Sequence, residues 1–458
     1  MPEFLTLVTP DEARKKLYSH LPTPEPATEI IDVHLSLNRV TAEEITAPHS
    51  LPNFRRSTVD GFAVCAQDTH GASDSMPAYL NCVGEVPMGD APKERINPGQ
   101  CMTIHTGGML PEGSDSVIML EYTQVTKHSD NPETNEKLGE IEVFKSISEG
   151  ENVIAIGEDV TQGQVVQVKG SVMRPAEIGG LLALGITKMR VVKRLKVGLI
   201  SSGDEVIPPS QPPRQGQVRD INSYTLGALV EQSGGEPVFF GIVGDSFDEL
   251  KKIAARALVE CDVVLITAGS SASARDMTAD VINQLGVPGV LVHGINTRPG
   301  KPTILGMCNS KAVIGLPGNP VSALVNGYML IVPLIEHLLG QIPRPHSVRQ
   351  AKLTVNLPSQ AGREDWWPVK LVFNNGQVPE GGAFLPQSRI RRNGTSLETG
   401  HSAKNSFQLE SFEDIYYADP IFGKSNLIFT LAAADGLLRI PPDATGLSAG
   451  EIVDVFLI

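Results

Sequence analysis

The 458-residue sequence is poor in aromatic residues and has no long basic or apolar run. Aromatic residues make up 5% of the chain, which argues against the stacking platforms that bind single-stranded nucleic acid. The formal net charge is −14, and no run of lysine and arginine suggests the basic face of a duplex-binding protein. No apolar run reaches the ~18 residues of a membrane span, and the first residues lack the apolar region of a signal peptide. We therefore expect a cytoplasmic protein that binds neither nucleic acid nor a membrane.

The sequence also lacks the cysteine and histidine patterns of metal and hydrolase sites. Its five cysteines contain no Cys-x-x-Cys pair, and an odd number of them fits a reducing compartment. The ten histidines are scattered, with no paired spacing. These patterns disfavour both zinc chemistry and Ser-His-Asp hydrolysis.

Helical and β-rich patterns alternate in the amino-terminal part of the chain. Residues 8–20 and 171–190 are predicted helices, and Thr9 and Glu12 form a capping box in the first. Short apolar runs at 51–149 predict a β-rich domain. We expect residues 1–50 and 150–192 to form one discontinuous linker domain, of mixed helical character, if the two helical segments pack together. The sequence alone leaves that packing open.

The rest of the chain predicts two further domains. Residues 193–342 alternate between apolar strands and helices, which indicates a central, doubly wound α/β domain with a parallel sheet. Ligands of such sheets bind at the carboxyl ends of the strands. Residues 343–458 return to a β pattern, which we interpret as a carboxy-terminal β-barrel or sandwich with an irregular loop at 386–424. The predicted fold class is therefore multidomain, α/β plus β.

Three loops that follow predicted strands of the α/β domain carry polar side chains. Residues 201–205 (SSGDE) could bind a phosphate or hydrated Mg²⁺, or form a simple strand-to-helix turn. Residues 267–276 combine hydroxyls with Arg275 and Asp276, which suits an oxyanion and a metal or polar ligand, although a structural loop is the alternative. In residues 315–323, Asn319 can cap a helix whose amino terminus would bind an anion, or would merely start the helix.

Cationic and acidic residues outside these loops are weaker candidates. Arg298 and Lys301 flank a Pro-Gly turn and would match a diphosphate or an oxyanion, with exposed surface charge as the alternative. Asp60, before a glycine, is by itself best explained as a turn residue. A cluster of arginines, which is best explained as part of a solvated loop, lies at Arg389, Arg391 and Arg392.

Taken in order, short segments along nearly the whole chain resemble the molybdopterin molybdenumtransferase family, which includes bacterial MoeA and the gephyrin E domain. No single segment is decisive, but nine collinear matches are not expected by chance. They are 57–63 (STVDGFA), 104–115 (IHTGGMLPEGSD), 157–160 (GEDV), 174–179 (RPAEIG), 201–205 (SSGDE), 220–223 (DINS), 298–302 (RPGKP), 315–323 (GLPGNPVSA) and 362–365 (GRED).

The resemblance implies an elongated four-domain subunit in a homodimer with shared active sites. It further implies that molybdate and Mg²⁺ bind with adenylated molybdopterin, the phosphoanhydride is cleaved, AMP leaves, and the metal enters the dithiolene. Contacts with upstream and downstream proteins of the cofactor pathway are also implied.

The resemblance also assigns roles to individual residues. Asp276, Glu205 and Asp60 would bind the cation or position the nucleophile, and Asp159 and Asp245 match further acidic positions. The implied molybdate and pterin-phosphate contacts are Ser271, Arg298, Lys301 and Ser322, together with Pro317 and Pro320, and Arg363 and Ser425 from the carboxy-terminal domain.

Two segments depart from the family pattern. The usual Gly-Gly-Val-Ser-Val-Gly is Ala-Gly-Ser-Ser-Ala-Ser at 268–273, where Ser273 replaces a glycine. The usual Lys-Pro-Gly-Lys begins here with Arg298, a planar fork instead of a point donor. Tungstate is therefore an alternative to molybdate. A non-catalytic pterin- or oxyanion-binding scaffold and an adenylyltransferase are alternatives to the transferase.

Overall fold

A computed structural model describes residues 7–130, 137–268, 272–345, 347–373 and 416–458. The chain divides into two compact units, one formed by residues 28–192 and the other by the segments on either side of it. Helix α1 (Pro10–Tyr18) begins with the expected capping box between Thr9 and Glu12. However, α1 contacts strands β18 (Pro288–His293) and β20 (Ile304–Cys308) of the α/β sheet. The expected grouping of residues 1–50 with 150–192 is therefore wrong for the segment before residue 28.

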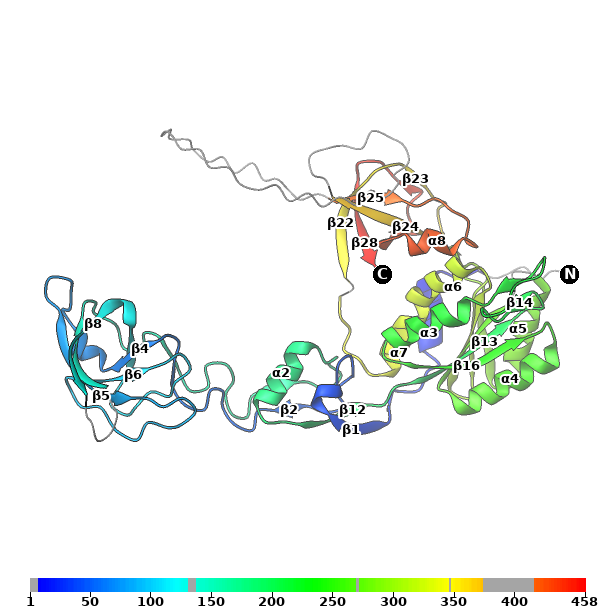
Figure 1. Cartoon of the computed structure of the whole chain (residues 1–458). Helices are drawn as coiled ribbons and strands as arrows, with labels where there is room; N and C mark the ends of the chain where they lie inside the picture. Colours follow the sequence, from blue (N-terminus) through cyan, green and yellow to red (C-terminus); the bar gives the residue numbers. More distant parts are fainter. Residues whose placement is uncertain (1–6, 131–136, 269–271, 346, 374–415) are drawn as a thin grey trace, which may run out of the picture. The chain divides into compact units, whose positions relative to one another are not determined.

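Within unit 28–192, the two ends of the segment pair with each other. Strand β1 (Thr28–Asp32) is antiparallel to β12 (Lys188–Val192), and helix α2 (Pro175–Ala183) packs near them (Figure 1). The β-rich insertion forms a six-stranded sheet in the order β7-β4-β6-β5-β9-β8, so the predicted insertion is present. Its strands are β4 (Gly61–Val64), β5 (Ala78–Glu85), β6 (Gln100–Ile104), β7 (Ser116–Met119), β8 (Thr123–Asp130) and β9 (Lys137–Val143). Short pairs join β2 (Ile45–Thr46) to β11 (Val165–Gln167) and β3 (Arg56–Ser57) to β10 (Val153–Ile154).

The α/β domain contains a six-stranded sheet in the order β16-β13-β17-β21-β20-β18. The strands not yet given are β13 (Lys196–Ser202), β16 (Glu236–Val243), β17 (Val263–Ala268) and β21 (Lys311–Pro317). The first four strands are parallel to one another, whereas β20 is antiparallel to both of its neighbours, β21 and β18. The sheet is therefore mixed, and the prediction of a parallel sheet is wrong for this edge. Strand β20 escaped the sequence analysis because its hairpin to β21 turns through Asn309 and Ser310 with positive φ, without the glycine that usually marks such a turn.

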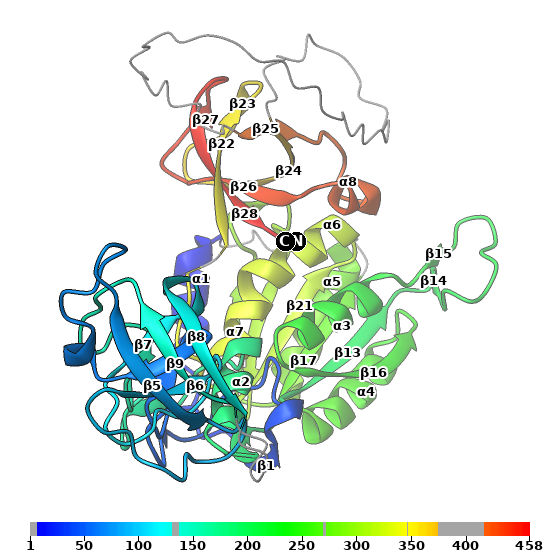
Figure 2. The same ribbon diagram turned by 60° about the vertical axis from the view of Figure 1, so that its left-hand side comes forward.

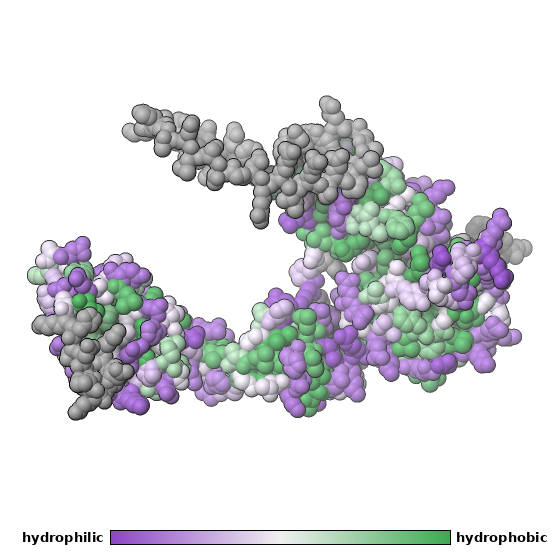
Figure 3. Space-filling model, viewed as in Figure 1, coloured by the Kyte–Doolittle hydropathy of each residue, from purple (hydrophilic) through white to green (hydrophobic). Residues whose placement is uncertain are grey.

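Helices cover both faces of this sheet. Figures 1 and 2 show α4 (Phe247–Glu260) and α5 (Ala272–Leu285) on one face and α3 (Asn222–Gln232), α6 (Pro320–Asn326) and α7 (Val332–Leu338) on the other. Residues 320–338 are long and apolar enough to cross a membrane, but 61% of that stretch is buried within the protein. It therefore serves as a core helix, with a π-helical turn at 327–331. In Figure 3, hydrophobic residues of the α/β domain gather on the visible face around β16, where Phe239 is exposed and stacks on Tyr224.

The carboxy-terminal domain is a closed β-barrel, as predicted. Its order is β19-β24-β25-β22-β28-β26, and an additional pairing between β24 and β26 closes it. Strand β19 (Thr297–Arg298) belongs to the α/β domain, so the two domains share a sheet. The other strands are β22 (Val348–Leu353), β24 (Glu364–Phe373), β25 (Tyr416–Pro420), β26 (Gly436–Ile440) and β28 (Ile452–Leu457), with helix α8 (Ile428–Ala432). Two minor pairs are β14 (Val206–Ile207) with β15 (Val218–Arg219) and β23 (Leu357–Pro358) with β27 (Gly446–Leu447). Most of the predicted irregular loop, with Arg389, Arg391 and Arg392, lies outside the described residues.

Candidate active site

The polar loops of the α/β domain meet at one edge of its sheet. Strands β13, β17 and β21 are parallel and in register, with Ser201 opposite Thr267 and Thr267 opposite Leu316. Ser201 Oγ lies 2.8 Å from Ser223 Oγ and 3.2 Å from Thr267 Oγ1, so three buried hydroxyls form a continuous chain. Polar side chains that are distant in the sequence therefore gather at the carboxyl ends of these strands, which is the edge where open α/β sheets bind ligands.

A cavity of about 320 Å³ opens beside this hydroxyl chain. Glu205, Asp220 and Asn222 line it. Asn222 Nδ2 donates to the carbonyl of Gly318 at 2.9 Å, which links the start of α3 to the loop after β21. The Asn222 side-chain oxygen is buried, with no hydrogen-bond partner within the described part of the chain. Of these residues, the sequence analysis named only Glu205. Asp220 and Asn222 lie in the segment 220–223, whose resemblance to the family could have pointed to them.

Acidic residues from two neighbouring loops interact at the same edge. The Asp245 N–H donates to Asp204 Oδ1 at 2.9 Å. Burial raises the pKa of the Asp245 carboxyl, and the charges of Asp204 and Glu205 raise it further. Glu205 and Asp245 are therefore close enough for their charges to interact.

The other acidic candidate of this domain is less closely tied to these loops. Asp276 lies near the start of α5 with an exposed side chain. Ser271 lies outside the described residues, and so does most of the altered serine loop before α5. Among the residues that the structure describes, no group of three or more histidine, cysteine, aspartate or glutamate side chains could hold a metal ion.

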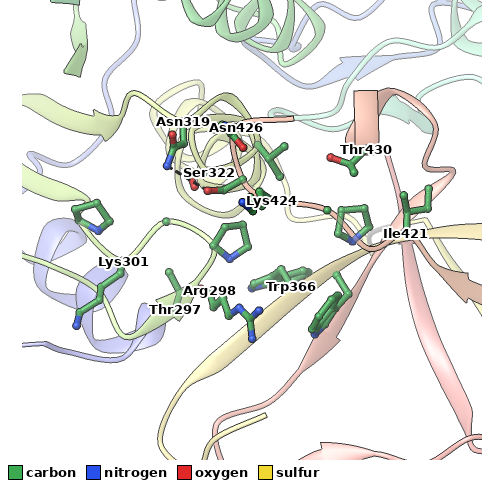
Figure 4. A pocket seen from close by; sticks show the side chains of 18 of the residues that line it. Thr297, Arg298, Lys301, Asn319, Ser322, Trp366, Ile421, Lys424, Asn426 and Thr430 are labelled. Carbon is green, nitrogen blue, oxygen red and sulfur yellow. Dashed lines mark hydrogen bonds between the residues drawn. The ribbon is translucent and has the colours of Figure 1, made fainter. Parts of the chain in front are cut away.

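A larger cavity, of about 720 Å³, lies between the α/β domain and the barrel (Figure 4). Four cationic side chains line it, with the hydroxyls of Ser322 and Ser425. Of the four, Lys424 was missed by sequence analysis because a single lysine in a loop carries no signal. The other three cations are Arg298, Lys301 and Arg363. Two residues, Asn319 and Asn426, line both this cavity and the acidic one.

A buried asparagine, Asn326, fixes the turn that carries Arg298 and Lys301. Gly300 has φ of +105°, and a Cβ there would lie 2.3 Å from Asn326 Nδ2. Asn326 Nδ2 donates to the Gly300 carbonyl at 3.0 Å and also to Thr303 Oγ1. The turn therefore requires glycine. In Figure 4 the Lys301 side chain extends away from that of Arg298, so the two cations do not form the convergent pair that their spacing suggested.

The start of α6 differs from the expected anion site. Asn319 occupies the N-cap position but makes no capping hydrogen bond, and its Nδ2 donates to Ser425 Oγ at 3.1 Å. The Val321 N–H donates to the Ser425 carbonyl at 3.1 Å. The barrel loop thus takes up donors that an isolated helix end would offer to an anion. Pro317 ends β21 and Pro320 starts α6, so both shape the chain beside Ser322.

Buried carboxylates of the barrel orient its arginines. Arg363 makes two hydrogen bonds to the fully buried Asp365, from Nε at 2.6 Å and from Nη2 at 2.8 Å. Glu364, also buried, accepts from Arg439 and from Trp366 Nε1. These bidentate contacts hold Arg363 in one orientation at the cavity wall.

Two acidic candidates belong to unit 28–192. Asp60 accepts from the Thr106 N–H at 2.9 Å, which lowers the pKa of its carboxyl, and the nearby His105 lowers it further. The hydrogen bond to Glu85 raises the pKa of His105. Asp60 is therefore an exposed, ionised carboxylate. Asp159 is also exposed, and its N–H donates to the Leu51 carbonyl.

Three family models match the chain in order. They are the MoeA N-terminal region (domain I and II) at residues 8–185, the "Probable molybdopterin binding domain" at 198–337, and the MoeA C-terminal region (domain IV) at 408–458. The first segment covers most of unit 28–192, the second covers most of the α/β domain, and the third covers the last strands of the barrel, β25, β26 and β28.

Relatives and solved structures agree with these models. A molybdopterin biosynthesis protein of Methanocaldococcus jannaschii is 33% identical, over 97% of this chain and 95% of its own length. A molybdopterin molybdenumtransferase of Haemophilus influenzae is 35% identical, over 79% of this chain and 85% of its own length. A crystal structure of a molybdopterin biosynthesis MoeA protein from Pyrococcus horikoshii matches with a TM-score of 0.77 and 29% identity, over 99% of this chain and 100% of that one.

The fold and the site thus define a multidomain protein built on a molybdopterin-binding type of α/β domain. The chain belongs to the MoeA family of molybdopterin molybdenumtransferases, which are enzymes.

Proposed function

We propose that this chain inserts molybdenum from molybdate into adenylated molybdopterin and releases AMP. The observation that carries the proposal is that a cationic cavity and an acidic cavity share Asn319 and Asn426 in their walls. A substrate with a pterin dithiolene at one end and a phosphoanhydride at the other needs both kinds of surroundings. The cationic cavity would receive an oxyanion, and the acidic cavity would receive the phosphoanhydride together with a cation.

The cationic cavity is proposed to bind molybdate and the pterin phosphate. Arg298, Arg363 and Lys301 provide charged N–H donors, and Ser322 and Ser425 provide hydroxyls. Ser271 is proposed to add a further hydroxyl, and Pro317 and Pro320 to frame the site. Tetrahedral oxyanions are bound well by such sets of charged and neutral donors.

The acidic loops are proposed to hold Mg²⁺. Their donor set fits, because Glu205 and Asp245 are hard oxygen ligands whose mutual repulsion a cation would relieve. Asp276 is proposed to join them or to position the attacking oxygen. When bound, Mg²⁺ would supply positive charge beside the phosphoanhydride oxygens.

The proposed reaction transfers no electrons. An oxygen nucleophile forms a bond to the phosphorus on the pterin side of the phosphoanhydride, and the bridging oxygen leaves with AMP. The two dithiolene sulfurs then replace oxygen ligands of molybdate, and these oxygens leave as water after protonation. In this sequence the protein's donors hold the oxyanion, and its carboxylates orient the bond that breaks.

We further propose a homodimer in which Asp60 and Asp159 of one copy complete the site of the other. Asp60 supports this proposal because it stays ionised and exposed in the unit that does not hold the two cavities. The proposed location is the cytoplasm, where proteins that adenylate the pterin and accept the finished cofactor would be partners.

The test is AMP release from adenylated molybdopterin. We expect release that requires both molybdate and Mg²⁺, and no AMP under those conditions would refute the transferase. Competition between molybdate and tungstate in the same assay, with the inserted metal measured by mass spectrometry, decides which oxyanion is preferred.

A further inference from the structure

The Arg298 guanidinium lies against the face of a tryptophan. Its central carbon is 5.2 Å from the centre of the Trp367 ring, and both residues line the cationic cavity. Arg298 comes from the α/β domain and Trp367 from strand β24 of the barrel. An arginine above an indole is the most favourable form of cation–π contact in proteins.

Both partners of this contact are held in place. Arg298 pairs with Asp365 in the parallel β19–β24 ladder, and Thr297 Oγ1 donates to the Glu364 carbonyl at 3.1 Å. The Trp367 ring packs edge-on against Phe422 at 5.6 Å and against the barrel core. This packing therefore holds the Trp367 ring facing the Arg298 guanidinium.

Stability alone does not explain this tryptophan. Its Nε1 is buried without a hydrogen-bond partner among the described residues, which is unfavourable for a donor. A phenylalanine would fill much of the same space without burying an N–H. The contacts of the larger ring offset this cost, and one of them is the stacking with Arg298.

We propose that Trp367 is a positioning residue for oxyanion binding. Stacking on the indole fixes the plane of the Arg298 guanidinium and leaves its N–H groups at the rim of that plane free to bind the oxyanion. The inference rests on the proposed function, because it takes the cavity to be the oxyanion site.

A double-mutant cycle on molybdate binding tests this proposal. We would measure molybdate affinity by equilibrium dialysis for wild type, Trp367→Leu, Arg298→Met and the double variant. Trp367→Leu should weaken binding about 3- to 10-fold in the wild-type background. It should have almost no effect in the Arg298→Met background, because the group that it positions is gone. An equal loss in both backgrounds would overturn the proposal.

Trp367→Phe separates positioning from simple packing. It should retain most of the affinity, since it keeps an aromatic face, and its unfolding temperature should not fall below that of wild type. Affinity as poor as that of Trp367→Leu in this folded variant would also count against the proposal. If wild type binds molybdate and the cycle is additive, only this inference fails. If wild type binds no molybdate and releases no AMP, the proposed function fails.

Discussion

Asp276 is the acidic residue of the site whose role can be tested with the least effect on the fold. Its side chain is exposed near the start of α5, so Asp276→Asn should change the free energy of unfolding by less than about 0.5 kcal/mol. We expect AMP release to fall by about 100-fold or more, because a charged group that orients the reacting oxygens would be lost. The matched control is Asp280→Asn, an exposed aspartate one turn further along α5, which should keep full activity. Normal turnover by the Asp276 variant would remove this residue from the mechanism.

The cysteines of the chain should differ sharply in their reactivity with pH. Cys82 and Cys101 lie opposite each other on β5 and β6, and the interaction with the Cys101 thiol lowers the pKa of Cys82. Burial raises the pKa of Cys308 to about 11. A thiol with a lowered pKa reaches its full thiolate fraction at a lower pH, so modification of Cys82 by a small methanethiosulfonate should level off at a lower pH than modification of Cys308 does.

Modification of Cys308 should instead still rise with pH at about pH 9, because its thiolate fraction remains small there. Peptide mass spectrometry after timed labelling measures both rates in one sample. A rate for Cys82 that rises in parallel with that for Cys308 would contradict the assigned pKa order.

At the scale of elements, the turn at 298–302 depends on its close approach to α6. Gly300→Ala should destabilise the protein by about 1–3 kcal/mol, because the new methyl group meets Asn326 and the backbone has positive φ. Molybdate affinity should fall with it, since Arg298 and Lys301 would move. Thermal unfolding and equilibrium dialysis measure the two effects.

Gly340→Ala is the matched control for this turn. Gly340 also has positive φ, at +64°, but a Cβ there meets nothing within 4 Å. This variant should show the strain without the clash and should leave molybdate binding unchanged. Equal losses of affinity in the two variants would show that the Gly300 contact with Asn326 is not what shapes the site.

Elements with strong local signals were predicted well, and elements that depend on partners were not. The capping box at Thr9 and Glu12 defines α1 by contacts three residues apart, so the sequence shows it. The missed strand at 304–308 is buried through pairing with β21 and β18, and its short apolar run has no local feature that separates it from a loop. The polar loops were found because parallel strands place their carboxyl ends at one edge.

At the scale of the whole molecule, the proposed shared site predicts complementation between inactive variants. Asp60→Asn and Asp276→Asn should each abolish AMP release when every copy carries the change. Mixed dimers, formed by co-expression with two different tags, should recover up to about half of the wild-type activity per dimer, because one of the two sites then has both carboxylates. Tandem purification followed by the AMP assay measures this recovery. Mixed dimers without activity would show that both residues act within one copy.

The sequence by itself determined the family, the alternation of strands and helices, and the kinds of side chain at the strand ends. These features depend on residue type and on local spacing, which can be read from the sequence without knowledge of the fold. The tertiary structure alone decided that α1 packs against the α/β sheet and that the Ser425 carbonyl accepts a hydrogen bond from the Val321 N–H of α6. It also decided that Arg298 stacks on Trp367. Such contacts join residues tens to hundreds of positions apart, and their energy depends on burial and orientation, which no local pattern encodes.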